Sequence, residues 1–384
     1  MKVLHVGKYF PPRYGGIETF MSQLMEEQAD QGLEVAALVH ADKLQSSNGE
    51  YAWKGCKIFE VKCFGQLIFA PVAPGYPYRI IHALRSFRPD IVHVHMPNLS
   101  AFWLLVVKRF FARQAEIVIH WHADVLGSAP TKLIKLFYPV YKLFETQLLK
   151  NADKVISTSP PYLKTSIPLK PFAEKCVVIP LGIKIKHFDV HSKKFSENRS
   201  IRLCMIGRLV YYKAHSVVLK ALAQLQEQKV SVTLDVIGDG ELALPLQKEC
   251  SELGIQNCVF WHGSVSEQQK DEILKSSDVL LLPSLERTEA FGVVLLEAAN
   301  YAVPAIVSNV NGSGMSYVIE NNVNGKVVDA SDADALASAV AEFIKPGRTT
   351  ECGKHAYNKL NKQFDIAAVA IEIQKLYKGL QNAS

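Results

Sequence analysis

The sequence predicts an α/β fold made of two doubly wound parallel sheets, one in each half of the chain. Short runs rich in Val, Ile and Leu alternate with segments of helical period, which is typical of parallel strands covered on both faces by helices. The alternation stops at the polar residues 187–200 and restarts at Ile201. With 384 residues, 48% of them hydrophobic, the chain is also long enough to bury two cores.

The predicted elements follow this alternation along the chain. Strands of the first half are expected at residues 2–7, 34–40, 90–95, 116–121, 154–157 and 176–180, with a helix at 16–30. Strands of the second half are expected at 201–206, 232–237, 258–261, 279–283, 305–308 and 326–328, with helices near 214–227, 242–252, 267–275, 291–301 and 332–344. Residues 1–190 are therefore expected to form the first domain and 191–363 the second, with 187–200 as the linker and the helical tail 364–384 docking back onto the first domain.

Several classes of protein are excluded or disfavoured by composition. The longest apolar runs, such as residues 101–107, are far shorter than the roughly 18 residues of a membrane-spanning helix. The first residues lack the apolar core and cleavage site of a signal peptide, and the seven cysteines form no C-x-x-C pair. These features indicate a protein of the reducing cytoplasm.

The positive charge is concentrated in the first half. Residues 1–190 hold 23 Lys and Arg against 15 Asp and Glu, a net charge of +8, whereas residues 191–384 hold 20 against 22, a net charge of −2. Such asymmetry predicts contact with an anionic surface, either nucleic acid or the cytoplasmic leaflet of a membrane. Because no nucleic-acid-binding motif accompanies the charge, the membrane surface is favoured. The stretch 102–113 mixes large apolar residues with three cations, which suits either a surface-seeking helix or a core helix with a polar end.

Ligands of open parallel sheets bind beyond the carboxyl ends of the strands, so a cleft shared by the two sheets is the expected site. The pair Gly15-Gly16 lies there, between the first strand and its helix. Glycines let the backbone approach a ligand closely, and the free amides of a helix start favour a phosphate. The alternative is a turn that merely needs positive φ angles.

Two cations follow the first strand of the second half. Arg208 and Lys213 flank its strand-to-helix turn, where they are able to neutralise a diphosphate. The alternative is a solvated basic turn, because most Lys and Arg side chains are simply exposed.

Two glutamates follow the apolar run 279–283. If a helix begins near Phe291, Glu289 lies in the preceding loop and Glu297 about two turns inside a mostly apolar helix. A carboxylate in such surroundings is costly unless something binds it, and the hydroxyls of a ribose or sugar would do so. A helix-start Glu and an internal ion pair are the structural alternative.

Two histidine pairs, His93-x-His95 and His120-x-His122, lie at strand ends, where each pair points to one side. Neither a carboxylate pair nor a cysteine joins them at ligand spacing, so we expect no metal site. The motif Asp332-Ala333-Asp334 resembles a metal–nucleotide motif, but its position predicts a helix cap.

Together these motifs resemble the retaining family-4 (group 1) glycosyltransferases of the GT-B fold, in which two Rossmann-like domains face a cleft. The resemblance rests on four motifs in the family's order: Gly15-Gly16, His122 before the acidic Asp124, Gly207-Arg208 with Lys213, and Glu289-x7-Glu297. It covers essentially the whole chain, and Ala214 stands where a Gly often follows the Lys.

The resemblance implies transfer of a sugar from a nucleoside-diphosphate donor to an acceptor hydroxyl, without a metal or other cofactor. The implied catalytic residues are His122, Arg208, Lys213 and Glu289. The implied donor-binding residues are Gly15, Gly16, Gly238, Gly263, Val265, Phe291, Gly292 and Glu297. The expected partners are the donor, a lipid-linked or saccharide acceptor of bacterial surface polysaccharide synthesis, and an anionic membrane surface, with no nucleic acid.

Two other functions are compatible with the motifs. A nucleotide-sugar epimerase shares this two-domain architecture, and fold alone does not fix chemistry. A catalytically silent nucleotide-sugar-binding subunit is less favoured because the full set of candidate catalytic residues is present.

Overall fold

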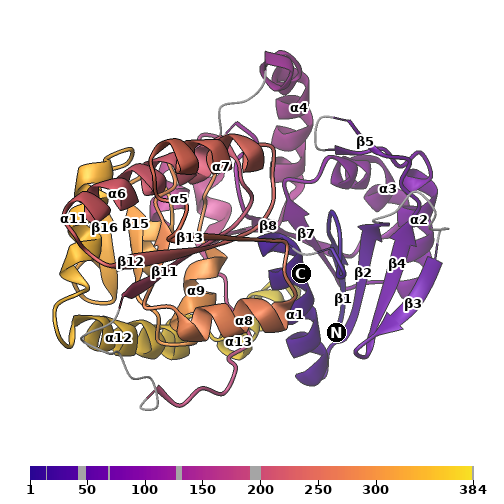
Figure 1. Ribbon diagram of the computed structural model, residues 1–384. Coiled ribbons are helices and arrows are strands. Elements are labelled where there is room, and N and C mark those ends of the chain that lie inside the picture. Colours follow the sequence, from indigo (N-terminus) through magenta and orange to yellow (C-terminus); the bar gives the residue numbers. More distant parts are fainter. Residues whose placement is uncertain (14, 42–48, 68–69, 127–131, 191–199, 383–384) are drawn as a thin grey trace. The chain divides into compact units, whose positions relative to one another are not determined.

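The computed structural model describes residues 1–13, 15–41, 49–67, 70–126, 132–190 and 200–382 (Figure 1). It divides into two compact units, the first made of Met1–Lys184 with Asp365–Ser384 and the second of Ile185–Phe364. The first boundary therefore precedes the expected one at residue 190. Residues 191–199 of the expected linker lie outside the described part of the chain.

The first unit is built on an eight-stranded sheet in the order β10-β9-β8-β7-β1-β2-β4-β3. Its strands are β1 (Lys2–Val6), β2 (Glu34–His40), β3 (Gly49–Trp53), β4 (Cys56–Val61), β7 (Ile91–Met96), β8 (Glu116–Trp121), β9 (Lys154–Ser157) and β10 (Cys176–Val178). Neighbouring strands are parallel, except that β3 runs antiparallel to β4 at the edge. A separate hairpin is formed by β5 (Gln66–Leu67) and β6 (Ala70–Pro71).

Most helices of the first unit lie between strands of this sheet in the chain, whereas the last one follows the second unit. They are α1 (Gly16–Asp30), α2 (Tyr76–Phe87), α3 (Leu104–Phe111), α4 (Lys132–Asn151), α5 (Pro160–Thr165) and the C-terminal α13 (Ile366–Gln381). The last helix joins this unit through backbone contacts, since the Ile366 amide donates to the Ile183 carbonyl at 3.0 Å. It then packs beside α1, where the Gln31 side chain donates to the Ala367 carbonyl at 3.2 Å.

The second unit has a six-stranded, entirely parallel sheet in the order β13-β12-β11-β14-β15-β16. Its strands are β11 (Ile201–Ile206), β12 (Val232–Ile237), β13 (Val259–Gly263), β14 (Val279–Leu282), β15 (Ala305–Ser308) and β16 (Gly325–Val328). Its helices are α6 (His215–Glu227), α7 (Ala243–Glu252), α8 (Glu267–Ser276), α9 (Val293–Ala299), α10 (Met315–Val318), α11 (Ala333–Glu342) and α12 (Arg348–Gln363). Strand β14 is buried along its whole length, as its uninterrupted Val and Leu residues predict.

The strands and helices that the sequence predicts are confirmed, with ends shifted by at most two residues. The largest shift at a site element is in α9, which begins at Val293 instead of near Phe291. The reason is Gly292, whose left-handed backbone (φ 85°) interrupts helical geometry directly before the helix.

Candidate functional site

Three predicted glycines meet at the carboxyl edge of the second sheet, because β11, β12 and β13 are parallel neighbours. The Gly207 amide donates to the Ile237 carbonyl at 2.9 Å, and the Gly238 amide donates to the Gly263 carbonyl at 2.8 Å. A Cβ atom at Gly238 would lie 2.0 Å from the Gly207 carbonyl oxygen. Glycine at this position is therefore required by close backbone approach, and the edge of the sheet is left without side chains.

Lys213 lies over this glycine edge. It ends a short 3₁₀ helix, Tyr211–Lys213, and is followed by Ala214 in the left-handed conformation. Its ammonium forms an ion pair with Glu289 Oε2 at 2.5 Å, and a Cβ atom at Gly207 would lie 3.1 Å from Lys213 Nζ. Both side chains of the pair are largely buried, with 11% and 14% of their surface exposed. The structure thus brings Lys213, Glu289 and Gly207 together.

The loop that carries Glu289 is held from two directions. The Leu285 amide donates to the Tyr212 carbonyl at 2.8 Å, so the loop follows the turn before Lys213. On the other side, the Ser313 hydroxyl donates to the Glu289 carbonyl, and the Gly314 amide donates to the Ala290 carbonyl at 2.7 Å. These hydrogen bonds hold the backbone of the loop, and none of them involves the Glu289 carboxylate oxygens, one of which pairs with Lys213.

Glu297 has a partner that the sequence analysis missed. It lies in the second turn of α9, where Lys270 of α8 donates to its Oε1 at 2.9 Å and also pairs with Glu267 at 2.9 Å. Burial raises the pKa of the Glu297 carboxyl despite the opposing charge of Lys270. The only sequence signal for Lys270 was its placement one turn after Glu267, which does not reveal a contact with another helix.

The predicted catalytic residue Arg208 and the predicted donor-binding residues Phe291 and Val265 are not gathered at the ion pair. Arg208 is exposed, and its guanidinium reaches the Tyr212 hydroxyl at 3.5 Å. The Phe291 ring is buried and packs edge-on against Phe364, with ring centroids 5.9 Å apart. Val265 lines a separate depression together with Gln269. The family resemblance assigned these three residues to one donor site, but their side chains lie in different surroundings.

In the first unit, Gly15 and Gly16 join β1 to α1. Gly15 is extended, with φ −161° and ψ 168°, and Gly16 is the first helical residue. Neither glycine has a positive φ angle, so the alternative of a turn that needs positive φ is wrong for this pair. A Cβ atom at Gly15 would lie 2.5 Å from Glu18 Oε2, an atom at the end of a flexible side chain that can move aside, so the contact does not itself require glycine.

His122 belongs to a buried cluster of five histidines, which the sequence analysis found only in part. The predicted pairs lie on one face of β7 and β8, where the rings of His93 and His95 stack with centroids 4.7 Å apart, and those of His120 and His122 with centroids 4.4 Å apart. The fifth member is His5, which is paired in register with His93 on the neighbouring strand β1. Burial lowers the pKa of His122 to about 3, so its ring is neutral at pH 7.

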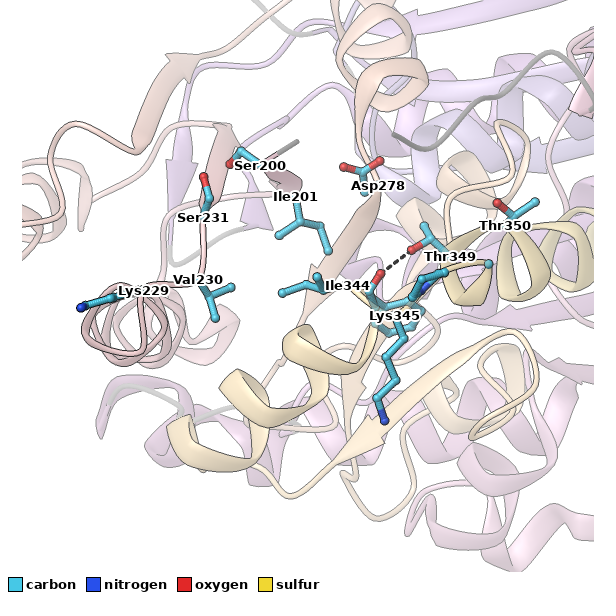
Figure 2. Close-up of a pocket in the computed structure, with 13 residues that line it drawn as sticks. Ser200, Ile201, Lys229, Val230, Ser231, Asp278, Ile344, Lys345, Thr349 and Thr350 are labelled. Atoms are coloured by element: carbon cyan, nitrogen blue, oxygen red, sulfur yellow. Dashed lines mark hydrogen bonds between the residues drawn. The ribbon is translucent and has the colours of Figure 1, made fainter. Parts of the chain in front are cut away.

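A depression in the second unit lies away from these residues. Ser200, Ile201, Ser231 and Asp278 line it at the amino ends of the strands, and its volume is about 430 Å³ (Figure 2). Figure 2 also shows the Thr349 hydroxyl, which donates to the Phe343 carbonyl at 2.8 Å. None of the predicted site residues lines this pocket, and parallel sheets bind ligands at the opposite edge.

Asp332 caps a helix, as its position predicted. Its Oδ1 accepts a hydrogen bond from the Ala335 amide at 2.8 Å at the start of α11, while Asp334 accepts one from Gln224. The two carboxylates are thus used by the protein itself.

Comparison with known proteins covers almost the whole chain. Residues 188–359 match the family model of the glycosyl transferases group 1, and residues 15–182 match that of a glycosyl transferase 4-like domain. The chain is 27% identical over 376 residues to O-antigen chain mannosyltransferase C of Escherichia coli, covering 95% of this chain and 94% of that protein. It is also 27% identical over 375 residues to D-rhamnosyltransferase WbpZ of Pseudomonas aeruginosa, covering 95% and 92%.

Solved structures with the same fold include two well-matched examples. Sucrose-phosphate synthase from Thermosynechococcus elongatus superposes with a TM-score of 0.79 and 19% identity over 100% of both chains. Anabaena HepE, solved in complex with UDP and glucose, superposes with a TM-score of 0.75 and 20% identity over 98% of this chain and 99% of that one. At these identities the likeness concerns the fold, which is the two-sheet GT-B architecture expected from the sequence.

Proposed function

The chain belongs to the group 1 glycosyltransferases, and from this premise we propose that it transfers a sugar from a nucleoside-diphosphate donor to an acceptor hydroxyl with retention at the anomeric carbon. The relatives are transferases, which favours transfer over the epimerase alternative. The observation that carries the proposal is the Lys213–Glu289 ion pair above the bare edge formed by Gly207, Gly238 and Gly263.

The proposed chemistry depends on stabilising the departing diphosphate. As the bond between the anomeric carbon and the diphosphate breaks, negative charge grows on the leaving oxygens. We assign stabilisation of this charge to Lys213, because its ammonium is already fixed by Glu289. We assign contact with the outer phosphate to Arg208, because its guanidinium is exposed at the turn that precedes Lys213. No metal ion is needed in this scheme, and full activity after treatment with EDTA is the expected result.

The remaining roles concern binding of the donor. Glu289 orients the transferred sugar, and Glu297 accepts hydrogen bonds from the ribose hydroxyls in exchange for part of its contact with Lys270. In the first unit, we assign phosphate binding to the backbone of Gly15 and Gly16, which carry no side chains. We assign a hydrogen bond with a sugar hydroxyl to His122. These assignments rest on the family resemblance together with the positions described above.

The names of the relatives suggest the substrate class. They include O-antigen mannosyl and D-rhamnosyl transferases and an Escherichia coli galactosyltransferase that acts on a diphosphoundecaprenol-linked sugar. We infer that this chain extends a lipid-linked or saccharide acceptor in the synthesis of a bacterial surface polysaccharide, using donors made in the cytoplasm.

A panel of UDP, GDP, ADP and dTDP sugars tests the function. A donor that binds only the native state raises the melting temperature, and the same donor should yield free nucleoside diphosphate when an acceptor is added. Conversion of the donor sugar without acceptor would support the epimerase instead. Binding without any turnover across the acceptors tried would support the silent binding subunit.

We further propose that the first unit rests on an anionic membrane surface through α3 and α4. The exposed apolar side chains of α4 are Leu136, Phe137, Val140, Leu143 and Phe144, and those of α3 are Val106 and Phe110. The two helices contact each other, and Phe102 before α3 stacks on Phe144 with centroids 5.7 Å apart. The apolar face is accompanied by exposed Lys135 and Lys142. Among the described residues, no helix is both long and apolar enough to cross a bilayer, so binding would be at the surface.

The stretch 102–113 has features of both structures that its sequence suits, a core helix and a surface-seeking helix. Leu104 and Val107 are buried, as in a core helix, while Val106 and Phe110 face outward. Sedimentation with phosphatidylglycerol vesicles at low salt tests the membrane proposal, with weaker binding expected at high salt. Replacing Leu136 and Val140 by Ser should reduce binding, whereas the matched control Leu244→Ser, at an exposed leucine of the second unit, should not. Equal binding of both variants would contradict the proposal.

A further inference from the structure

The five buried histidines of the first unit are joined in an unbroken hydrogen-bonded chain. One arm runs from His122 Nε2 to His95 Nδ1 at 2.9 Å, and from His95 Nε2 to His5 Nδ1 at 3.0 Å. His5 Nε2 then lies 2.8 Å from Gln28 Oε1, which is supplied by α1. Each contact has the length of a hydrogen bond between a ring nitrogen and its acceptor.

The second arm continues from the other side of Gln28. Its Nε2 donates to the Tyr377 hydroxyl of α13 at 3.4 Å, and that hydroxyl contacts His93 Nδ1. His93 Nε2 then lies 3.3 Å from His120 Nδ1. The side chains that form this hydrogen-bonded series are almost fully buried. Water therefore cannot substitute for a missing partner.

The ring geometry shows that these contacts are in-plane bonds. The rings of His95 and His122 are inclined by only 14°, and their centroids are 5.2 Å apart. That separation equals the N···N distance of 2.9 Å plus about 1.1 Å from each nitrogen to its ring centre. The pair formed by His5 and His95, with centroids 5.3 Å apart, follows the same relation. The rings therefore meet edge to edge, with a proton of one facing the lone pair of the other.

A neutral imidazole donates through one nitrogen and accepts through the other, so the direction of the first bond sets the direction of all that follow. The Gln28 carbonyl oxygen can only accept, and this places a proton on His5 Nε2 and a lone pair on its Nδ1. His95 must then donate through Nε2 and accept through Nδ1, and His122 must donate through Nε2. Nδ1 of His122 is left as a lone pair, and it has no partner in the structure.

We propose that Gln28, acting through His5 and His95, holds His122 in the tautomer that carries its proton on Nε2, so that Nδ1 presents a permanent hydrogen-bond acceptor. Gln28, His5 and His95 are positioning residues, because they act through His122 alone. The proposal deepens the proposed function and rests on it for the nature of the ligand: an acceptor nitrogen at this position suits a hydroxyl that donates its proton, as a sugar hydroxyl does. Neutral rings are required for such a chain, and burial lowers the pKa of His5 to about 4.

A metal ion is the competing use of this cluster. His93, His95 and His120 have ring nitrogens close enough together to ligate one. However, the lone pair of each ring is already directed at a donor, namely Tyr377 for His93, His122 for His95 and His93 for His120. A metal would have to displace all three bonds, and the group includes neither a thiolate nor a carboxylate.

Nuclear magnetic resonance of the full-length protein with ¹⁵N-labelled histidine tests the proposal, because protonated and unprotonated ring nitrogens have widely separated ¹⁵N shifts. The His122 signals are assigned from their loss in His122→Asn. The expected wild-type spectrum shows His122 protonated at Nε2 and unprotonated at Nδ1. Gln28→Leu and His5→Phe, which break the first arm at two different points, should each give a mixture of His122 tautomers. Tyr377→Phe, which breaks only the second arm, is the matched control and should leave the His122 signals unchanged.

Kinetics separate this proposal from the proposed function. With a donor found in the panel, Gln28→Leu should lower kcat/KM about tenfold, the effect of weakening one hydrogen bond, and Tyr377→Phe less than about twofold. A wild-type proton on Nδ1, or a His122 tautomer indifferent to both first-arm variants, would overturn the proposal, as would stoichiometric uptake of Zn²⁺ with loss of the ring N–H signals. Unchanged turnover by His122→Asn would instead remove His122 from the proposed site while leaving the tautomer result intact.

Discussion

Lys213 and Glu289 are 76 positions apart in the chain and form a 2.5 Å ion pair at the carboxyl edge of the second sheet. The sequence analysis considered a helix-start role for Glu289 and an ion pair only for the internal Glu297, yet both glutamates are ion-paired in the structure. This does not conflict with a role in catalysis, because a fixed ammonium is a preorganised group for a developing negative charge.

We expect Lys213→Met and Glu289→Gln each to lower kcat by about 10²–10³, more than KM rises. Each should also lower the melting temperature, because one charge of a largely buried pair loses its partner. The double variant should recover most of the melting temperature but none of the kcat. Initial rates and thermal melts on the three proteins provide the measurement, and recovery of activity by the double variant would leave the pair with a structural role only.

Glu297→Gln should act mainly on donor binding. The ribose does not react, so KM for the donor is expected to rise about tenfold while kcat changes little. Asp271→Asn is the matched control, since it removes the neighbouring ion pair of α8 with Lys186 and should leave KM unchanged. A fall of kcat in Glu297→Gln at constant KM would contradict the assignment.

Gly238→Ala should abolish nucleotide binding and lower stability. The added Cβ would lie 2.0 Å from the Gly207 carbonyl oxygen, and the φ angle of +134° is one that side chains rarely adopt. The separation of β11 from β12 at this edge would have to increase. Gly379→Ala is the control, because that position in α13 has open space around it. Titration with the best nucleotide, together with melts, measures both effects; normal affinity in Gly238→Ala would refute the close approach described here.

Ala214→Gly should stabilise the protein by about 1 kcal/mol. Ala214 has φ 61° and ψ 33°, a left-handed conformation that costs an L-residue about 1–2 kcal/mol and glycine very little. The gain from glycine is partly offset because glycine has greater freedom in the unfolded chain. Ala335→Gly inside α11 is the control and should destabilise by about 0.5–1 kcal/mol. Urea unfolding of both variants gives the comparison, and destabilisation by Ala214→Gly would show that the strain is absent.

The histidine cluster should make the protein sensitive to acid. Burial is the main cause that lowers the pKa of all five rings, to about 4 for His5 and about 3 for His122. In the unfolded chain these rings bind protons with a pKa near 6.5, whereas in the folded chain they stay neutral. Their full contribution to the free energy of unfolding is therefore present above about pH 6.5, and it is lost as the pH falls toward the lower pKa values of the folded state. At about pH 5.5 each ring that stays neutral in the folded chain contributes a loss on the order of 1 kcal/mol, so the cluster lowers the free energy of unfolding by several kcal/mol. Free energies of unfolding in urea at pH 7.5, 6.5 and 5.5 should show this decline; a flat profile would mean that the rings are not buried neutral.

The sequence analysis missed two neighbouring strands of the first sheet, β3 and β4, and helix α4. Strand β4 (Cys56–Val61) is mostly buried, but Lys57 and Glu60 interrupt its apolar run. Strand β3 (Gly49–Trp53) was not predicted, because it lies at the sheet edge and its central residues are exposed, so no buried alternation marks it. Helix α4 was also not predicted, and its internal Pro139 together with its exposed apolar residues hides the helical period.

By itself, the sequence determined the two-sheet architecture, twelve of the fourteen strands of the two sheets, and the glycines and charged residues that follow those strands. These features depend on the alternation of buried runs with helices, which is local and repeats along the chain. Only the tertiary structure decided that Lys213 pairs with Glu289, that Lys270 meets Glu297, and that His5 joins the other histidines. Each of these contacts depends on which strands and helices become neighbours and on the register between them. Packing of the whole sheet fixes both, because the paired segments are far apart in the chain.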